Sequence, residues 1–504
     1  MVNKIPSLSV TTFIAILKSV MNYETIIGLE VHAQLLTKSK MFCRCSADYA
    51  SAPPNTHVCP VCLGMPGVLP TINQQAVEYT VMTALALNCT ISDYTKFDRK
   101  NYPYPDLMKG YQISQYDAPF GRSGWLTIEA DGKKKKVGIT RVHLEEDVAK
   151  LLHRTSPDGQ SYSLVDVNRG GVPLMEVVSE PDIRSPEEAR QYLIKLRSIL
   201  QYLGVSTGNM EEGSFRCDAN ISIRPENSTD FLAKVEVKNM NSFKAVYLAM
   251  EYEAKRQRKV AAEGKKLTQE TRGWVEEKGV TVAQRSKEYA HDYRYFPEPD
   301  LPPLVLNREW VEKIRSELPE LPEARRDRFV AEHGLPLYDA DLLTTSKDMA
   351  NYFEDSVKIS KDVKPKEISN WLLGPASGIM NANNIDVAEF SKRVSPEQFR
   401  ELIVYSHSRI NVTIAKLVLE EMFKTGKTAL AIIQQQVLSQ ISDTEVIEKE
   451  VIAAIKSNAQ AVADYKAGKK QSLKFLVGQV MRATKGRANP TLVNELLEKN
   501  LKEG

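Results

Sequence analysis

Several features are scarce in this sequence, and each scarcity narrows the possible classes of protein. Six cysteines among 504 residues are too few for the disulfide scaffold of a small secreted domain. No apolar run approaches the roughly 20 residues that span a bilayer. The 67 basic and 64 acidic residues leave a net charge of only +3, so a nucleic-acid partner must be bound by a local patch. A hydrophobic content of 42% is typical of a globular protein, and the length predicts about two to four domains.

The common nucleotide-binding loops are also missing. Thr425–Thr428 (TGKT) resembles the end of a P-loop, but that motif requires glycine where this chain has Glu421. No G-x-G-x-x-G opens a strand–helix unit. If the protein uses ATP, we expect a fold outside the P-loop and Rossmann classes.

The first 20 residues have a short apolar centre that resembles a signal peptide. They lack a convincing small-residue cleavage site, and Lys18 follows the apolar part. We therefore interpret residues 1–20 as an extension outside the fold, or as a lead-in before an alternative start at Met21. Secretion is the alternative.

Four of the six cysteines are clustered as C-x-C followed by C-P-V-C. Two short-spaced pairs can bring four thiolates to one tetrahedral ion, and four protein ligands leave no open position. The pattern predicts a structural zinc site, with two disulfides or a redox dithiol as alternatives. Its ligands would be Cys43, Cys45, Cys59 and Cys62. Cys89 and Cys217 are isolated in the sequence and are expected to be buried small apolar side chains.

Residues 26–35 (IIGLEVHAQL) alternate between apolar and polar side chains. This period of two predicts a strand with one apolar face. The other face presents Glu30, His32 and Gln34 in a row. Alone, the pattern favours a solvated sheet face, and the alternative is one wall of a catalytic or metal-binding cleft.

A second alternating segment ends in three consecutive acids. Residues 125–129 and 136–144 predict a hairpin around Asp131–Gly132. The face of its second strand would carry Ile139, Arg141, His143, Glu145 and Asp147. The acids Glu145, Glu146 and Asp147 repel one another unless cations lie among them. With Glu30 and His32 they form a plausible Mg²⁺ site. Histidine is an unusual ligand for Mg²⁺, so Mn²⁺ tolerance or an outer position for His32 is the alternative.

Three further segments, 163–182, 211–224 and 234–243, carry charged faces of the same kind. Their polar positions are Asp166, Asn168, Arg169, Glu176, Arg216, Asp218, Asn220, Lys234, Glu236 and Lys238. Helices are predicted over residues 71–90 and 185–203. Together these segments predict an antiparallel sheet whose polar side is a cleft. The tyrosine- and proline-rich residues 97–117 are expected to form an irregular loop that lines a site.

Strand alternation ends near residue 313, and helical spacing continues to the C-terminus. The predicted fold class is therefore α+β: residues 21–312 form a domain built on a mainly antiparallel sheet, 313–428 an all-helical domain, and 429–504 a small helical tail domain. The tail holds a run of bases around the apolar residues 475–481, which suggests a packed helix bordered by phosphate-binding residues. The bases are Lys466, Lys469, Lys470, Lys474, Arg482, Lys485 and Arg487.

These segments together resemble the GatB family, the B subunits of the tRNA-dependent amidotransferase GatCAB. The matching stretches include IIGLEVHAQL, FDRKNYPYPD with KGYQISQYD, GITRVHLEED, VDVNRGGVPLMEVVSEPDIRSPEEA, MEEGSFRCDANISIRP, HDYRYFPEPDLPPL and FLVGQVMRATKGRANPTLVNELL. They cover nearly everything from Met21 onward, and several exceed ten residues. A chance match is therefore negligible.

The resemblance implies a cradle-like, kinase-type domain over residues 21–312, with the cysteines in a zinc-binding insertion, and a tail that contacts tRNA. It implies a cytoplasmic, ATP-dependent ligase that works with an amidase A subunit and a small C subunit as a heterotrimer. With ATP and Mg²⁺, the B subunit would phosphorylate the side-chain carboxylate of Glu-tRNA(Gln), Asp-tRNA(Asn) or both. Ammonia released from glutamine by the A subunit would then displace phosphate. The alternative is a tRNA-binding, assembly-only subunit, which would not need convergent Glu30, His32 and Glu145.

The resemblance also assigns residues. Glu30, His32 and Glu145 match the family's catalytic metal-site motifs. Glu211, Glu212 and Asp218 are weaker candidates for the magnesium. Lys100 and Glu146 match positions that gate the ammonia path in the family, where a charged pair could pass a small neutral amine. The chain departs from the family pattern in two ways: only some members have the four cysteines, and Met108 stands where many have proline. No serine-rich amidase signature is present, as expected for a B subunit.

Overall fold

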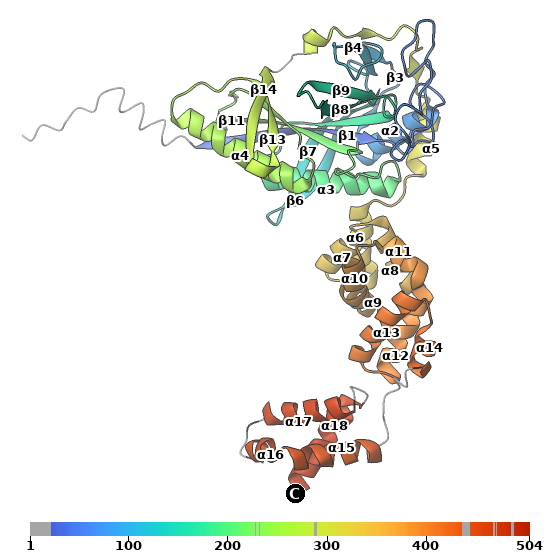
Figure 1. The fold of residues 1–504 in the computed structure, drawn as a ribbon, viewed down its shortest axis with the longest axis vertical. Coiled ribbons are helices and arrows are strands. Elements are labelled where there is room, and N and C mark those ends of the chain that lie inside the picture. The colour runs from blue at the N-terminus through green and yellow to red at the C-terminus, as the bar shows by residue number, and fades with distance from the viewer. Residues whose placement is uncertain are drawn as a thin grey trace, which may run out of the picture. The chain divides into compact units, whose positions relative to one another are not determined.

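The computed structural model describes residues 22–226, 228–230, 232–286, 290–435, 444–466, 469, 471–484 and 488–503. The predicted extension 1–20 and the tail bases Lys470, Lys485 and Arg487 lie outside these ranges. The chain divides into two compact units between Leu321 and Pro322. The first is built on a large sheet and the second is helical, which confirms the predicted α+β class (Figure 1).

The first unit is organised around a nine-stranded sheet in the order β14-β13-β12-β11-β1-β10-β7-β6-β2. Neighbouring strands are antiparallel except for the β12/β13 pair. In chain order the strands are β1 (Tyr23–Gln34), β2 (Thr90–Ile91), β6 (Gly121–Ala130), β7 (Lys133–Glu146), β10 (Pro173–Ser179), β11 (Phe215–Pro225), β12 (Val235–Lys238), β13 (Glu270–Val275) and β14 (Val280–Ser286). The predicted antiparallel sheet is confirmed.

One face of this sheet is covered by three helices, α2 (Gln74–Ala86), α3 (Pro186–Leu203) and α4 (Phe243–Ala262). Figure 1 shows α3 and α4 along this side and the small strands β4, β8 and β9 on the other. The apolar positions of β1, Ile27, Leu29, Val31 and Ala33, are buried in the core beneath the helices. Because side chains alternate along a strand, the polar positions of β1 must face away from this core.

Both predicted helices form, and local capping explains where they lie. Ser185 accepts a hydrogen bond from Glu188 N, and Gly204 closes α3 with φ 71°, a conformation that glycine adopts without strain. The helix predicted over 71–90 is shorter because Asn73 caps α2 by accepting from Ala76 N. The predicted hairpin also forms, with Asp131 and Gly132 both at positive φ in its turn.

The prediction that Ile139 shares a face with Arg141 is wrong. A register shift between Val178 and Ser179 of β10 places Thr140 as an extra residue in β7. Such a bulge reverses the alternation, so Ile139 joins Val142 and Leu144 in the buried core. Arg141 and the residues after it keep their predicted face.

The expectation of an irregular loop over residues 97–117 is also wrong. This segment contains β4 (Asp98–Asn101) and β5 (Tyr111–Ser114), which form a three-stranded sheet with β15 (Phe296–Pro297). Two more small sheets pair β3 (Tyr94–Thr95) with β16 (Leu304–Val305), and β8 (Lys150–Thr155) with β9 (Ser161–Asp166). Strands β4 and β5 pair with each other, and the distant β15 adds a third strand that local sequence patterns do not reveal.

Gly124 on β6 is the position where the fold is least tolerant of a side chain. A Cβ there would lie 2.3 Å from Cys89 Sγ and 2.6 Å from Leu87 O. We expect Gly124→Ala to destabilise the first unit by about 1–3 kcal/mol, because the clash is partly with backbone. Urea unfolding checks this, with Gly132→Ala as a comparison in which the added Cβ meets nothing within 4 Å and only the turn is strained. Equal stability of Gly124→Ala and the native protein would contradict it.

Helix α5 (Arg308–Ser316) belongs to the first unit, since Val311 and Ile314 are part of its core. The unit therefore ends several residues beyond the predicted residue 312. The helices of the second unit are α6 (Pro322–His333), α7 (Leu337–Leu343), α8 (Lys347–Lys358), α9 (Pro365–Trp371), α10 (Ser377–Asn383), α11 (Val387–Arg393), α12 (Pro396–Ser408), α13 (Val412–Thr425), α14 (Ala429–Gln435), α15 (Thr444–Ser457), α16 (Ala459–Lys466), α17 (Gln471–Ala483) and α18 (Pro490–Glu503).

The second unit has two separate buried clusters. One runs from Phe329 to Ile433 and the other from Ile447 to Leu501. The predicted division at residue 428 stays a prediction. Of the helices that the structure describes, none has the length and apolar character needed to cross a bilayer.

Candidate functional site

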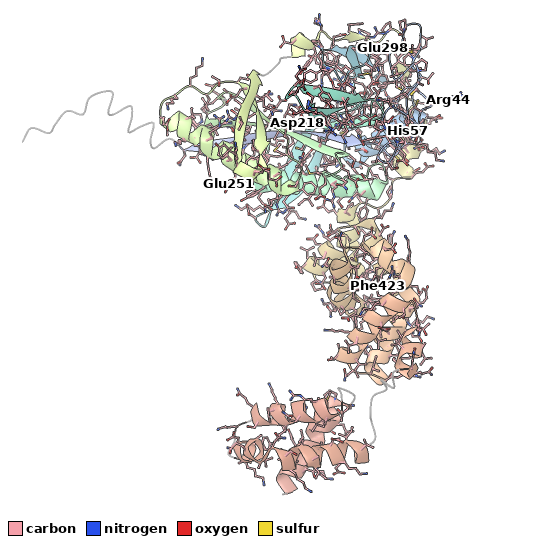
Figure 2. The ribbon with its side chains drawn as sticks, viewed as in Figure 1. Arg44, His57, Asp218, Glu251, Glu298 and Phe423 are labelled. Carbon is pink, nitrogen blue, oxygen red and sulfur yellow. The ribbon has the colours of Figure 1, made fainter. Side chains whose placement is uncertain are left out.

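The sheet face opposite the helices forms a charged cleft of about 1050 Å³. Strands β1, β7, β10, β11 and β12 supply its floor, and the segments around β4, β5 and β15 supply side chains at its edge. Figure 2 labels Asp218 within this region of the first unit. The predicted polar faces of these strands are therefore brought together in one site.

Four charged or titratable residues form a row across neighbouring strands. Arg216 of β11 is opposite His32 of β1, His32 is opposite Glu176 of β10, and Glu176 is opposite His143 of β7. Directly opposed residues have Cβ atoms about 4.5–5.5 Å apart. The register alone therefore places basic groups on both sides of the Glu176 carboxylate.

His32, Glu145 and Glu176 form a group whose donor atoms lie within 4.8 Å of one another. His32 Nε2 is 3.5 Å from Glu145 Oε1 and 3.5 Å from Glu176 Oε2. His143 Nε2 lies 3.1 Å from Glu176 Oε2, and Ser114 Oγ donates to Glu145 Oε2 at 3.0 Å. Two carboxylates and one imidazole fit a divalent cation, and His143 and Ser114 orient the carboxylates.

The electrostatics of the group follow from its burial. Burial alone would lower the pKa of His32, but Glu176 and Glu145 raise it to about 9. Burial would likewise raise the pKa of Glu176, yet His143 and His32 hold that pKa well below its ordinary value. The imidazolium of His32 therefore balances the carboxylate charge at neutral pH, a role that a bound cation would take over.

Glu30 lies outside this group, although it was predicted as a ligand. Its Oε1 accepts a hydrogen bond from Asn220 Nδ2 at 2.7 Å, and its register partner on β11 is Asp218. Glu30 still lines the cleft. Glu176 completes the group with His32 and Glu145 instead. The sequence feature that could have identified Glu176 is that it is the single charged residue of the apolar strand PLMEVVS. Its side chain is buried there.

The weaker candidates also line the cleft. Asp218 pairs with Lys238, whose Nζ lies 2.6 Å from Asp218 Oδ2. Glu211 and Glu212 are exposed in the turn before β11. Each of these three carboxylates thus faces the cleft without joining the His32 group.

The three consecutive acids at the end of β7 diverge. Glu145 contacts the histidines, and Glu146 Oε1 lies 2.5 Å from Lys109 Nζ. Asp147 Oδ2 accepts from Gln34 Nε2 at 2.7 Å and lies 3.0 Å from Arg216. Each acid has its own basic partner, which removes the expected repulsion.

The predicted charged pair of Lys100 with Glu146 is not formed. Glu146 points to the opposite side of β7 from Glu145 and lines a second cavity of about 210 Å³ beside Cys43 and Cys62. Lys100 Nζ faces the main cleft, 4.9 Å from the ring centroid of Tyr293. The partner of Glu146 is Lys109 because strand alternation places Glu145 and Glu146 on opposite faces.

The clustered cysteines meet as the spacing predicted. Cys43, Cys45, Cys59 and Cys62 are free thiols whose sulfur atoms lie within 4.8 Å of one another. Arg44 and His57 mark this part of the first unit in Figure 2. A hydrogen bond from Cys43 lowers the pKa of Cys62 to about 4, and the buried Lys40 adds to this. Four cysteine sulfur atoms around one point are the donor set of a structural zinc ion.

The remaining motifs lie in the second unit. The TGKT residues join two helices: α13 ends at Thr425 with Gly426 as its cap (φ 69°), and Thr428 Oγ1 accepts from Ala431 N at the start of α14. Glu421, in place of the first P-loop glycine, lies inside α13, which agrees with the exclusion of a P-loop. In the tail, Lys466, Lys474 and Arg482 are exposed, and Lys469 Nζ lies 3.0 Å from Asp464.

The fold and the site define an α+β protein with a carboxylate–imidazole metal-type site in a polar cleft on an antiparallel sheet, joined to helical domains. Residues 25–312 match the GatB/GatE catalytic domain, and residues 351–501 match the GatB domain. The chain belongs to the GatB family, the B subunits of tRNA-dependent amidotransferases, which confirms the resemblance.

Relatives match over nearly the whole chain. The B subunit of the aspartyl/glutamyl-tRNA(Asn/Gln) amidotransferase from Dehalococcoides mccartyi (strain CBDB1) is 62% identical over 492 residues, covering 96% of this chain and 99% of the relative. The protein of the same name from Thermodesulfovibrio yellowstonii is 54% identical over 484 residues, covering 96% of this chain and all of the relative.

Proposed function

We propose that this chain phosphorylates the side-chain carboxylate of Glu-tRNA(Gln), Asp-tRNA(Asn) or both, using ATP and Mg²⁺, so that ammonia can convert it to the amide. The complex would be an ATP-dependent ligase with glutamine as nitrogen donor. The observation that carries the proposal is the His32–Glu145–Glu176 group, which lies in a cleft large enough for a nucleotide and an aminoacyl end. A purely assembling subunit would have no use for buried carboxylates converging there.

The chemistry explains why phosphorylation is needed. A carboxylate oxygen is a poor leaving group, so ammonia does not displace it directly. In the first step the carboxylate oxygen attacks the γ-phosphorus of ATP, and the bond from that phosphorus to ADP breaks. In the second step ammonia attacks the acyl carbon, the carbon–oxygen bond breaks, and phosphate leaves with the original carboxylate oxygen. Ammonia loses a proton to solvent.

The residues of the cleft suit this reaction because phosphoryl transfer depends on positioning and charge neutralisation. Glu145, Glu176 and His32 would hold Mg²⁺, which when bound supplies positive charge beside the phosphate oxygens. His143 orients the Glu176 carboxylate through its 3.1 Å contact. Arg216 is held by Asp147 at the edge of the group and adds positive charge to the floor.

The proposal includes the rest of the complex. An amidase A subunit would release ammonia from glutamine, and a small C subunit would complete a heterotrimer. Lys100 and the Lys109–Glu146 pair would lie along the ammonia path, on the two sides of β7. A structural zinc ion would be held by the four clustered cysteines. Charged tRNAs are made and used in the cytoplasm, which is the proposed location.

The test is ATP hydrolysis by this chain assembled with its A and C subunits. We expect phosphate release that requires misacylated tRNA and stops when uncharged tRNA replaces it. Parallel assays with Glu-tRNA(Gln) and Asp-tRNA(Asn) distinguish the two substrates. Phosphate release that ignores the aminoacyl group would contradict the proposal and favour an assembly-only subunit.

The basic tail is expected to contact tRNA phosphates. Replacing Lys469, Lys470 and Lys485 with alanine should weaken tRNA binding and reduce the slope of log K against log salt by about 2, because each neutralised phosphate contributes about 0.7–0.9. Filter binding at several salt concentrations measures this. Lys427→Ala is the matched control, since that exposed lysine precedes the tail and donates to Gln435 Oε1, away from the basic run. If the triple substitution leaves the slope of log K against log salt unaltered, the tail does not contact tRNA phosphates.

A further inference from the structure

Lys40 is a buried lysine beside the clustered cysteines, and the proposed function gives it no role. It is only 1% exposed and is among the largest fully buried side chains of the described residues. Burying an ammonium group is costly unless an anion compensates for its lost hydration. Among the described residues, no carboxylate lies within ion-pair distance of Lys40, whereas Lys109, which lines a cavity with Cys62, is paired with Glu146 at 2.5 Å.

The hydrogen bonding of Lys40 does not explain its burial. Its Nζ donates to the Val167 carbonyl at 3.2 Å. That carbonyl also accepts from Gly170 N at 2.9 Å, so it would keep a partner without the lysine. An ammonium group has three donors, and one bond to a neutral oxygen does not replace its hydration. A nearby anionic group is therefore needed.

The cysteine cluster lies where such a group is needed. Lys40 and Cys62 both flank Gly171, because a Cβ added to that glycine would lie 3.4 Å from Lys40 Cδ and 3.7 Å from Cys62 Cβ. The positive charge of Lys40 interacts with the Cys62 sulfur. The backbone is tied to the ligand segment as well, since Lys40 N donates to the Cys45 carbonyl at 2.9 Å.

A zinc ion bound by these cysteines would create a negative group in a largely buried place. Four thiolates and Zn²⁺ have a net charge of −2, because the metal offsets only two of the four negative charges. Cys59 N donates to Cys62 Sγ at 3.1 Å, and such a bond disperses the charge without neutralising it. Cys62 is only 8% exposed, so water does little to stabilise its sulfur. A buried cation beside it would offset one of the two remaining charges.

We infer that Lys40 is the counter-cation of the cysteine cluster, and that its buried ammonium increases the affinity of the four sulfur ligands for zinc. The inference rests on the structural zinc ion of the proposed function and is independent of the phosphorylation step. It assigns the lysine an electrostatic role, in which it binds no metal itself.

The test is zinc titration of the reduced, metal-free full chain in competition with a chromophoric chelator. Lys40→Met keeps the apolar stem but removes the charge, and should weaken zinc binding about 10- to 100-fold, as loss of groups around metal ligands does. Lys38→Met is the matched control, because Lys38 is exposed in the same segment and water screens its charge. It should keep the native affinity. The absorption spectrum of Co²⁺-loaded Lys40→Met should equal that of the native chain, since the four sulfur ligands are unchanged.

A second substitution separates the charge of Lys40 from its packing. Cys45→His replaces one thiolate by a neutral imidazole, which zinc also accepts as a ligand, and reduces the net charge of the group to −1. Lys40→Met should therefore weaken zinc binding less in the Cys45→His chain than in the native chain. A lysine needed only for packing would have the same effect in both. Urea unfolding of the metal-free chains should show no loss of stability in Lys40→Met.

Three results would overturn the inference. The first is native zinc affinity in Lys40→Met, and the second is an equal loss of affinity in both backgrounds. The third is a Lys40→Met chain that is less stable than the native chain, or does not fold, in the absence of metal, because the lysine would then be needed for packing. A native chain that binds no zinc would overturn the structural zinc site as well. If zinc affinity depends on Lys40 but the assembled complex does not phosphorylate misacylated tRNA, the phosphorylation proposal alone fails.

Discussion

Replacing Glu145 by glutamine is expected to lower misacylated-tRNA-dependent ATP hydrolysis at least a hundredfold. Glu145 supplies one of the two carboxylates of the His32–Glu145–Glu176 group, and it is buried there. The amide keeps the shape of the side chain but removes its charge, so the site holds a divalent cation less tightly. Loss of one preorganised charged or hydrogen-bonding group typically costs a factor of about 10² to 10³ in rate. Phosphate release by the assembled complex measures it.

The control for this change is Glu251→Gln. Glu251 lies on α4, away from the cleft, and makes an exposed ion pair with Lys255 at 3.1 Å (Figure 2). Both variants should assemble with the A and C subunits, as judged by gel filtration. A titration with Mn²⁺, followed by electron paramagnetic resonance, should show weaker binding only in Glu145→Gln. Native ATP hydrolysis in Glu145→Gln would remove this group from the mechanism.

The second large effect is expected at the cysteine cluster. The purified chain should contain one zinc ion, and Cys62→Ser should lose it. Structural zinc contributes on the order of 10 kcal/mol in small zinc domains, so the segment around the cluster should open. Arg44 is exposed within this segment. Trypsin cleavage after Arg44 should therefore become at least tenfold faster in Cys62→Ser, and in the native chain after chelation.

Restoring zinc to the chelated native chain should restore protection, whereas added Mg²⁺ should not. Cys62→Ser should keep the rest of the first unit folded, since its core lies in the large sheet. A native chain that contains no zinc and whose four thiols form disulfides on oxidation without loss of protection would contradict a structural metal at this site.

The strands of the cleft were predictable because their side chains alternate strictly. β1 and β11 each bury one apolar face, so Ile26–Leu35 and Phe215–Arg224 reveal their polar faces without any other information. His32 was found in this way, and Glu145 was found from the run of three acids at the end of a second alternating segment. The four cysteines were found from spacing alone, because two short pairs can reach one ion without any knowledge of the surrounding fold.

The missed features depend on contacts between distant segments. Glu176 lies in an apolar strand and becomes a site residue only because His32 and His143 are its register partners on both sides. The extra residue Thr140 in β7 is visible only against the neighbouring β10. Likewise, β4 pairs with β5 and also with Phe296 and Pro297 from far along the chain, and the second of these pairings cannot be seen locally. Sequence periodicity contains no information on such partners.

The acids Glu145, Glu146 and Asp147 illustrate both a correct prediction and a wrong one. Their repulsion predicted that cations must lie among them, and the structure provides three different ones: the histidines, Lys109 and Arg216. The choice of partner follows from alternation, which sends Glu146 to the opposite side of β7 from its neighbours. That is why the expected pairing of Glu146 with Lys100 failed.

Activation of the side-chain carboxylate by phosphorylation can be tested by oxygen labelling. Glu-tRNA(Gln) or Asp-tRNA(Asn) carrying ¹⁸O in the side-chain carboxylate is amidated by the assembled complex with ATP and glutamine, and the released phosphate is analysed by mass spectrometry. If the carboxylate is phosphorylated, each phosphate should contain one labelled oxygen, transferred from the carboxylate when the carbon–oxygen bond breaks. Amide formation with unlabelled phosphate would contradict it.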